Sequence, residues 1–214
     1  MSSPNFASLP ISPQQLEALQ GLGYASMTPV QAQSLPLILS GKDVIIQAKT
    51  GSGKTAAFGI GLLNRLNPRF FGVQALVMCP TRELAEQVGQ SIRQLASRMA
   101  NVKTVLLCGG KPFGPQRDSL HHGANIVVGT PGRIQDHLQR GTLDLKGVRT
   151  FVLDEADRML EMGFAEVMAS ITSHLPKNRQ TILLSATFPD DIKTISRSLQ
   201  EKPIQITVDA EVSH

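Results

Sequence analysis

The chain has 214 residues, of which 41% are apolar and 18% are charged, so it is long enough to bury the core of one large domain. Its formal net charge of +4 is compatible with a polyanionic partner, although proteins that bind no nucleic acid often carry a similar excess. With one tyrosine and no tryptophan, the sequence disfavours a broad aromatic platform that stacks many bases. Contacts with a phosphate backbone are the better expectation for any nucleic-acid partner.

The cysteines and the N-terminal residues indicate the cellular compartment in which the protein is expected. Cys79 and Cys108 each end an apolar run typical of a buried strand, which favours free thiols over a disulfide. The first ten residues, MSSPNFASLP, lack a basic segment followed by an apolar stretch, and no apolar run approaches the length that spans a bilayer. We therefore expect a soluble cytoplasmic protein that makes no contact with membranes.

In chain order, two short helices are predicted first, opening at Ser12-Pro13 and Thr28-Pro29, because each pairs a capping hydroxyl with proline at the first helical position. Short apolar runs then alternate with stretches of helical periodicity, which predicts an α/β fold with a largely parallel central sheet and helices on both faces. Residues 1–208 are predicted to form this domain, and the polar residues 209–214 to begin a linker. The predicted strands are 44–47, 75–79, 104–108, 126–128, 150–154, 181–184 and 204–208.

A glycine-rich loop between the first strand and the next helix predicts a phosphate-binding site. Its glycines allow backbone N–H groups to approach phosphate oxygens, and Lys54 can reach the β and γ phosphates at the positive end of the helix. Thr55 offers a hydroxyl to Mg²⁺. The first position, Ala48, departs from the usual glycine, and an ordinary glycine turn that caps a helix is the alternative. The loop consists of Ala48, Lys49, Thr50, Gly51, Ser52, Gly53, Lys54 and Thr55.

An acidic tetrapeptide follows the fifth predicted strand. Asp154 lies where ligands of open α/β sheets gather, and it is the candidate residue for the Mg²⁺ side of the site. Glu155 is the candidate general base for nucleotide hydrolysis. Alternatively, these acids merely complement the positive end of the following helix.

Together the motifs resemble those of the DEAD-box ATP-dependent RNA helicases, a resemblance that covers nearly the whole chain. It implies a RecA-like P-loop domain that binds ATP and Mg²⁺. It also implies that a segment at residues 4–32 recognises adenine, with Gln31 bonding the base and Phe6 and Tyr24 nearby. From local sequence, Thr28-x-x-Gln31 is equally a capping box, and Phe6 a core residue. The motifs are Phe6, Gly23 to Gln31, Ala48 to Thr55, Pro80 to Ala85, Gly109-Gly110, Thr130 to Arg133, Asp154 to Asp157 and Ser185 to Thr187.

The resemblance also assigns an RNA track and a coupling element. Each proposed RNA-binding motif follows a predicted strand and offers N–H groups, hydroxyls or an arginine to phosphates, although each taken alone is a common turn. Such contacts distinguish RNA from DNA through 2′-hydroxyls and backbone geometry. The RNA residues are Pro80, Thr81, Arg82, Glu83, Gly109, Gly110, Thr130, Pro131, Gly132 and Arg133, and the coupling residues are Asp157, Ser185, Ala186 and Thr187.

Helicases of this family use two lobes, so we expect a second RecA-like lobe, and any C-terminal RNA-binding domain, to lie outside this chain. Within the family, the stretches QAKTGSGKTAAFGIGLL and CGGKPFGPQRDSL most resemble a bacterial member associated with large-subunit ribosomal RNA. The implied activity is RNA-stimulated ATP hydrolysis coupled to local unwinding of RNA duplexes, with ribosomal RNA as the expected target. A DNA-directed or other P-loop ATPase and a non-catalytic nucleotide-binding scaffold are the alternatives.

Overall fold

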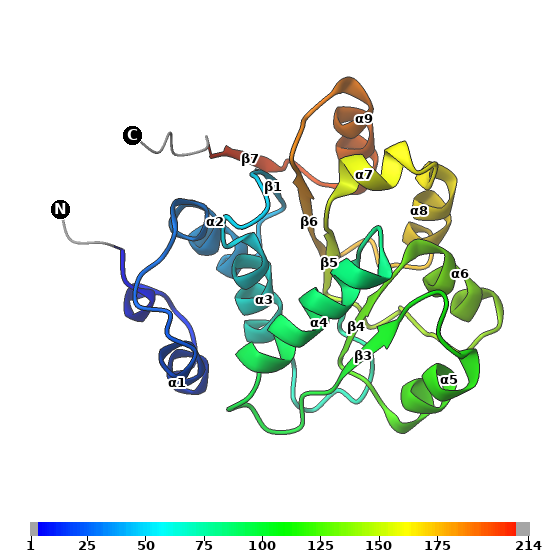
Figure 1. Ribbon diagram of the computed structural model, residues 1–214, viewed down its shortest axis with the longest axis horizontal. Helices are drawn as coiled ribbons and strands as arrows, with labels where there is room; N and C mark the ends of the chain where they lie inside the picture. Colours follow the sequence, from blue (N-terminus) through cyan, green and yellow to red (C-terminus); the bar gives the residue numbers. More distant parts are fainter. Residues whose placement is uncertain (1–3, 209–214) are drawn as a thin grey trace.

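Seven short parallel strands form the centre of the protein, which the computed structural model describes from residue 4 to residue 208 (Figure 1). All seven predicted strands are confirmed, and six of them differ from their predicted bounds by one residue at one or both ends. The strands are β1 (Val44–Gln47), β2 (Ala75–Met78), β3 (Thr104–Leu107), β4 (Ile126–Gly129), β5 (Thr150–Leu153), β6 (Gln180–Ser185) and β7 (Ile204–Thr207).

The strand order in the sheet is β3-β4-β2-β5-β6-β1-β7, and every neighbouring pair is parallel. All strands therefore end at one edge of the sheet, here called the carboxyl edge, and begin at the opposite one, the amino edge. Loops at the carboxyl edge of such sheets carry the ligand sites.

Helices connect the strands and cover both faces of the sheet, as predicted (Figure 1). Each of β1 to β6 is followed by a helix, and β5 by two. In the described part of the chain, no helix is both long enough and apolar enough to traverse a lipid bilayer. The helices are the 3-10 turn η1 (Phe6–Ser8) and the α-helices α1 (Pro13–Gly21), α2 (Pro29–Leu39), α3 (Lys54–Asn64), α4 (Arg82–Leu95), α5 (Phe113–His122), α6 (Pro131–Gln139), α7 (Ala156–Glu161), α8 (Ala165–Thr172) and α9 (Asp190–Leu199).

Successive side chains along each strand point to opposite faces of the sheet, which divides the core into two layers. Val44 and Ile46 of β1 pack with apolar side chains of α2, α3 and α4, whereas Ile45 faces the layer that contains residues of α6, α7, α8 and α9. Because both faces of a parallel sheet are covered, its strands are apolar on both sides. Cys79 and Cys108 are buried free thiols at the ends of β2 and β3.

A buried carboxylate fastens three loops at the amino edge. Asp43, just before β1, accepts hydrogen bonds from the backbone N–H of Thr181 at 2.9 Å and of Glu201 at 2.7 Å. Gln180 donates from the same side to the carbonyl oxygens of Ile38 and Lys42. These bonds fix where β1, β6 and β7 begin, and thereby the register of half the sheet.

Asp43→Ala should lower the free energy of unfolding by about 2 to 4 kcal/mol, because it leaves two backbone N–H groups without an acceptor in a buried place. Urea unfolding measures the loss. The control is Asp144→Ala, which removes an exposed carboxylate that accepts one N–H, from Lys146, and should cost less than about 1 kcal/mol. Equal losses in the two variants would contradict this account of Asp43.

Candidate active site and nucleic-acid interface

The strand order sorts the predicted motifs into two neighbouring groups along the carboxyl edge. The phosphate loop follows β1, the acidic tetrapeptide follows β5, and Ser185 to Thr187 end β6, so adjacent strands in the order β5-β6-β1 carry the nucleotide motifs. The three predicted RNA motifs follow β3, β4 and β2, which are likewise adjacent. Residues far apart in the sequence thus form one continuous edge with two halves.

The phosphate loop takes the backbone shape that its glycines allow. Gly51 and Gly53 have φ of +83° and +87°, in the left-handed region that favours glycine, and α3 begins directly after them at Lys54. The first turn of α3 therefore points its unpaired N–H groups into the loop. Ala48 has no positive φ, and its N–H bonds the carbonyl of Ser185 at 3.3 Å, which explains why this position accepts alanine.

Two side chains at the N-terminal end of α2 hold this loop in place. The Thr28 hydroxyl donates to the Ser52 carbonyl at 2.8 Å, and Gln31 Nε2 donates to the Gly53 carbonyl at 3.1 Å. Gln31 Oε1 meanwhile accepts from the Thr28 N–H at 2.9 Å, completing the capping box. A Cβ at Gly53 would lie 2.6 Å from Gln31 Nε2, so glycine is required here for space as well as conformation.

The predicted adenine residues lie beside the loop at the N-terminal end of the domain. Phe6 is 3% exposed and belongs to the core, where its ring meets Tyr24 edge-on with centroids 5.9 Å apart. Tyr24 reaches the cleft that the phosphate loop lines. Because Gln31 has both amide atoms engaged and Phe6 is packed, their contacts with adenine stay predictions.

Across the cleft from the loop, a buried carboxylate faces the loop lysine. Lys54 Nζ lies 3.8 Å from Asp154 Oδ1, with side chains 8% and 1% exposed. That distance is too long for a hydrogen bond, and Oδ1 has no hydrogen-bond partner in residues 4–208. Burial raises the pKa of Asp154 to about 6, although nearby Lys54 opposes the shift. An unsatisfied buried carboxylate oxygen next to Thr55 is a fit for a hard divalent cation.

Glu155 occupies a strained position at the mouth of this cleft. Its φ and ψ of 51° and 51° are left-handed, which costs a residue with a Cβ on the order of 1 kcal/mol. Its carboxylate lies 3.4 Å from Arg158 Nη1. The cleft has a volume of about 340 Å³, and α4 supplies one wall that the sequence did not indicate. These wall residues are Leu84, Gln87, Val88 and Ser91.

The last residue of the acidic tetrapeptide joins β5 to the end of β6. Asp157 Oδ2 accepts from the Thr187 N–H at 3.2 Å and from its hydroxyl at 3.0 Å, and the Ser185 hydroxyl donates to the Thr187 carbonyl. Ala186 lies between these two residues. The turn that carries Asp154 is therefore bonded to the segment after β6.

At the other half of the edge, short contacts join the three RNA motifs to one another. Thr81 caps α4 by accepting from the Leu84 N–H, whereas Thr130 accepts from the Gly109 N–H at 3.2 Å. Arg82 is half-buried, lies beside Gly110 and has ion pairs of 3.8 and 4.0 Å with Glu83 and Glu86. Pro80 and Pro131 are buried, and Gly132 is exposed.

Arg133 supports this interface from within. It is 17% exposed and donates to the Lys111 carbonyl at 2.7 Å and to Gln116 Oε1 at 3.1 Å. Gln116 Nε2 donates in turn to the Cys108 carbonyl at 3.0 Å, so the chain on both sides of Gly109-Gly110 is fixed. As found, Arg133 positions the glycine loop, and a direct phosphate contact stays a prediction.

A buried histidine completes that support. His137 is fully buried, and its Nε2 lies 2.9 Å from Gln116 Oε1 while Nδ1 lies 2.7 Å from the Thr142 hydroxyl. Since Oε1 only accepts, Nε2 carries the proton and Nδ1 accepts from Thr142. Burial, and then the charge of Arg133, lower the pKa of His137 to about 4, so the ring is neutral at neutral pH. The ring also stacks on Phe113 at 4.0 Å.

Comparison with known proteins gives the family. A sequence model of the DEAD/DEAH box helicases matches residues 28–195, well over half of the chain. The chain belongs to the DEAD/DEAH box helicase family. A crystal structure of a DEAD box protein from the hyperthermophile Methanococcus jannaschii superimposes with a TM-score of 0.91 at 41% identity, covering 96% of this chain and 56% of that one. The predicted RecA-like α/β fold is thus confirmed.

Curated relatives in this DEAD-box family bear the names of RNA helicases. The ATP-dependent RNA helicase DbpA of Escherichia coli is 55% identical over 200 residues, which cover 94% of this chain and 44% of DbpA. ATP-dependent RNA helicase DeaD of Escherichia coli is 46% identical, covering 97% and 33%. DEAD-box ATP-dependent RNA helicase CshA of Geobacillus kaustophilus is 45% identical, covering 96% and 44%. The chain spans less than half the length of each.

Asp154→Asn tests the buried carboxylate of this DEAD-box domain. Because the pKa of Asp154 is about 6 rather than 3.8, the folded chain between these pH values holds a proton that the unfolded chain has released. The free energy of unfolding therefore falls as the pH rises through this window, by up to about 3 kcal/mol. Urea unfolding without divalent cations is measured at about pH 4 and pH 7.5. The free energy of unfolding of the variant should rise relative to that of the wild type as the pH rises.

His137 acts in the opposite sense, since its pKa is lowered and stability is lost as the pH falls from 6.5 towards about 4. It is present in both proteins, so its effect cancels in the difference between variant and wild type. A difference that is the same at both pH values would rule out a raised pKa for Asp154.

Gln116→Leu should loosen the glycine loop, because Cys108, Arg133 and His137 all lose a buried partner. Hydrogen exchange of the amides of residues 109–111 should accelerate on the order of tenfold, while the amides of 48–55 keep their rates. The control is Gln139→Leu, an exposed change at the end of α6. Unchanged exchange at 109–111 would contradict the support assigned to Gln116.

Proposed function

We propose that this chain is the ATP-binding lobe of an RNA helicase, in which ATP hydrolysis at β5-β6-β1 is coupled to RNA binding at β3-β4-β2. The observation that carries the proposal is the pairing of Lys54 with the buried Asp154 across one cleft. A lysine beside a glycine-rich turn suits the β and γ phosphates, and the opposed carboxylate suits the cation that accompanies them. The proposal is also supported by the relatives DbpA and DeaD, which are named ATP-dependent RNA helicases.

Thr55 and Asp154 are the residues that would hold Mg²⁺ in this proposal. Both line the cleft, and Asp154 Oδ1 lacks any other partner among residues 4–208. In the same residues there is no cluster of three His, Cys, Asp or Glu side chains that could hold a metal alone, so phosphate oxygens and water would supply the remaining ligands. When bound, Mg²⁺ neutralises charge that develops on the phosphates.

Glu155 orients and deprotonates the attacking water in the proposed reaction. Its left-handed backbone sets it at the mouth of the cleft, next to Asp154 and opposite the phosphate loop. Arg158, 3.4 Å away, helps to keep the carboxylate in place. Lys54 stabilises the phosphates throughout.

RNA would lie along the loops after β3, β4 and β2 and be held through its phosphates. Gly110 and Gly132 are exposed there and would offer backbone N–H groups, whereas the Gly109 N–H is bonded to Thr130, and Arg82 adds a cation. The Asp157–Thr187 contact links the nucleotide half of the edge to the segment after β6. We propose that this contact reports the state of the γ phosphate, so that RNA affinity and nucleotide state change together.

The remaining parts of the function lie beyond this chain. We propose that a second RecA-like lobe completes the ATP site with arginines and that the whole protein acts in the cytoplasm on ribosomal RNA during assembly of the large subunit. Loss of such arginines lowers turnover by about a thousandfold. The 214-residue chain alone should therefore bind nucleotide weakly, hydrolyse it slowly and separate no duplex.

Glu155→Gln should lower ATP turnover at least about a hundredfold and leave nucleotide affinity within about threefold of wild type, because it removes the base and keeps the shape. Turnover is measured with RNA present, in this chain and in a protein that carries the second lobe. The control, Glu161→Gln, removes an exposed acid of the same helix and should change neither quantity. Unchanged turnover of Glu155→Gln would refute Glu155 as the base, whereas a wild-type two-lobed protein without turnover would indicate a nucleotide-binding scaffold.

The choice of RNA is tested separately. RNA should stimulate the two-lobed protein at least about tenfold more than single-stranded DNA of the same sequence, because 2′-hydroxyls take part in recognition. Equal stimulation by DNA would point to a DNA-directed ATPase built on the same site.

A further inference from the structure

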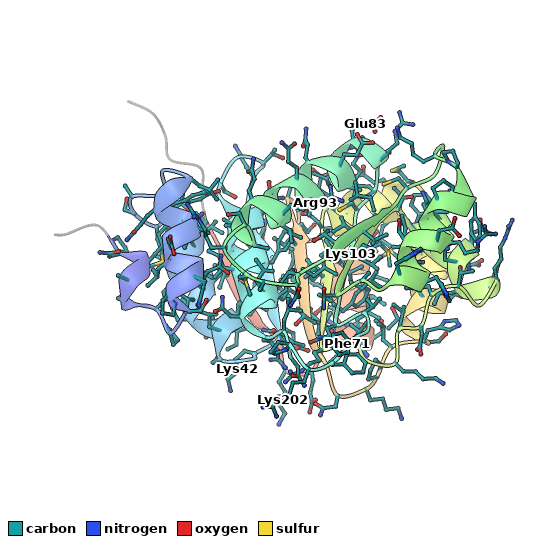
Figure 2. The ribbon with its side chains drawn as sticks, turned by 90° about the horizontal axis from the view of Figure 1, so that it is seen from below. Lys42, Phe71, Glu83, Arg93, Lys103 and Lys202 are labelled. Carbon is teal, nitrogen blue, oxygen red and sulfur yellow. The ribbon has the colours of Figure 1, made fainter. Side chains whose placement is uncertain are left out.

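The amino edge of the sheet, opposite the proposed ATP and RNA sites, is lined with exposed cations. They lie in the loops that lead into β2, β5, β6, β1 and β7, and these five strands are consecutive in the sheet. Figure 2 shows Lys42, Lys202 and Phe71 towards the lower side of the molecule and Glu83, which follows β2, towards the upper side. We call this surface the basic edge: Lys42, Arg69, Lys146, Arg149, Lys177 and Lys202.

Packing contacts join the loops of the basic edge into one surface. The Phe70 ring lies against Gly147, which brings the loop of Arg69 to that of Lys146 and Arg149. Arg149 Nη1 donates to the Arg65 carbonyl at 3.1 Å, and Arg65 Nη1 lies over Gly41, next to Lys42.

The other side of this surface is fixed in the same way. Gln180 Nε2 donates to the Lys42 carbonyl at 2.8 Å, so the loop before β6 lies beside the loop before β1. Asp43 bonds the Glu201 N–H at 2.7 Å and thereby holds the loop of Lys202. Adjacent strands are about 4.8 Å apart, so the loops that precede them place their cations in a row.

The six cations of the basic edge outnumber the exposed acids in the same loops, which are Asp144 and Glu201. Within residues 4–208, none of its six side chains forms an ion pair, whereas Arg98, Arg117 and Lys193 on other surfaces each have a carboxylate within 3.8 Å. The Asp43 carboxylate is buried and already bonded to backbone N–H groups.

Arg65 shows the same shortage of negative charge. Among residues 4–208 its buried Nε has no hydrogen-bond partner, and its pKa is lowered by burial and then by Arg149, although Asp43 opposes the shift. A surface that carries mostly one sign of charge attracts a polyanion.

One exposed aromatic residue accompanies these cations. Phe71 is 90% exposed, in the same loop as Arg69, at the rim of a hollow of about 380 Å³ that Gly147 and His121 also line. Cations that track a phosphate backbone beside an open aromatic face are the combination that binds single-stranded nucleic acid without sequence preference.

We propose that the basic edge is a second RNA-contacting surface, which binds the phosphates of an RNA segment that continues beyond the track on the carboxyl edge. The inference rests on the proposed function for the choice of RNA as the polyanion. Strands of four to six residues at about 3.3 Å each separate the two edges by roughly 13 to 20 Å, and the loops add to this distance. A short RNA therefore fills the track alone, and only a longer one also reaches the basic edge.

The test compares two triple variants that remove the same charge. The edge variant carries Lys42→Gln, Lys177→Gln and Lys202→Gln, and the control variant carries Arg98→Gln, Arg117→Gln and Lys193→Gln. Affinity of the 214-residue chain is measured by fluorescence anisotropy for single-stranded RNAs of about 8 and about 40 nucleotides, over a range of salt concentrations. Arg82→Ala serves as the variant of the proposed track.

The edge variant should bind the long RNA about tenfold more weakly at low salt, with the slope of log K against log salt smaller by about 2, since three phosphate contacts are lost. Its affinity for the short RNA should match wild type, and the control variant should match wild type for both. Arg82→Ala should weaken binding to both RNAs. Phe71→Ala should weaken binding to the long RNA alone.

Three results would overturn the inference or its basis. Unchanged affinity of the edge variant for long RNA would overturn it, as would equal losses in the edge and control triples, which would indicate general electrostatics. If circular dichroism shows that the edge triple does not fold, Lys146→Glu replaces it, and the same results count for or against the inference. Wild-type protein that binds neither RNA, even with nucleotide present, would instead refute the proposed function itself.

Discussion

The arrangement of this domain depends on one constraint, that all seven strands run in the same direction. Because parallel strands end together, six loops from distant parts of the chain meet at one edge. The order β3-β4-β2-β5-β6-β1 then separates them into a half rich in glycine N–H groups and a half with a lysine and three acids. Strand order, more than any single motif, brings the two halves into contact, since β2 and β5 are neighbours.

Within the nucleotide half, electrostatics oppose stability. Asp154 is held in a place where its charge is poorly solvated and Lys54 compensates only in part. Glu155 adds a left-handed backbone next to it. A folded protein keeps such unfavourable features only where the surrounding packing fixes them, and here the buried strands β5, β6 and β1 do so. The ligands proposed for the cleft would relieve the desolvation.

The sequence predicted much of this, for identifiable reasons. Periodicity located every strand, and Gly51 to Thr55 predicted the phosphate loop because few other patterns place Lys-Thr after two glycines. The conformation of Glu155 could not be predicted, since nothing in Asp-Glu-Ala-Asp requires a left-handed residue. The support of the glycine loop by Gln116 and His137 depends on α5 and α6 meeting, which follows from the order of β3 and β4. The linker prediction for residues 209–214 falls outside the described residues.

The double role of Gln31 joins a helix to the phosphate loop. Its oxygen caps α2 while its nitrogen holds Gly53, and Thr28 reaches Ser52 from the same turn. A displacement of the loop would therefore break bonds made by the residues that cap α2. Any anion that orders the loop should also slow the fraying of α2, although it does not contact this helix. Binding in the cleft would therefore stabilise the N-terminal segment that precedes β1.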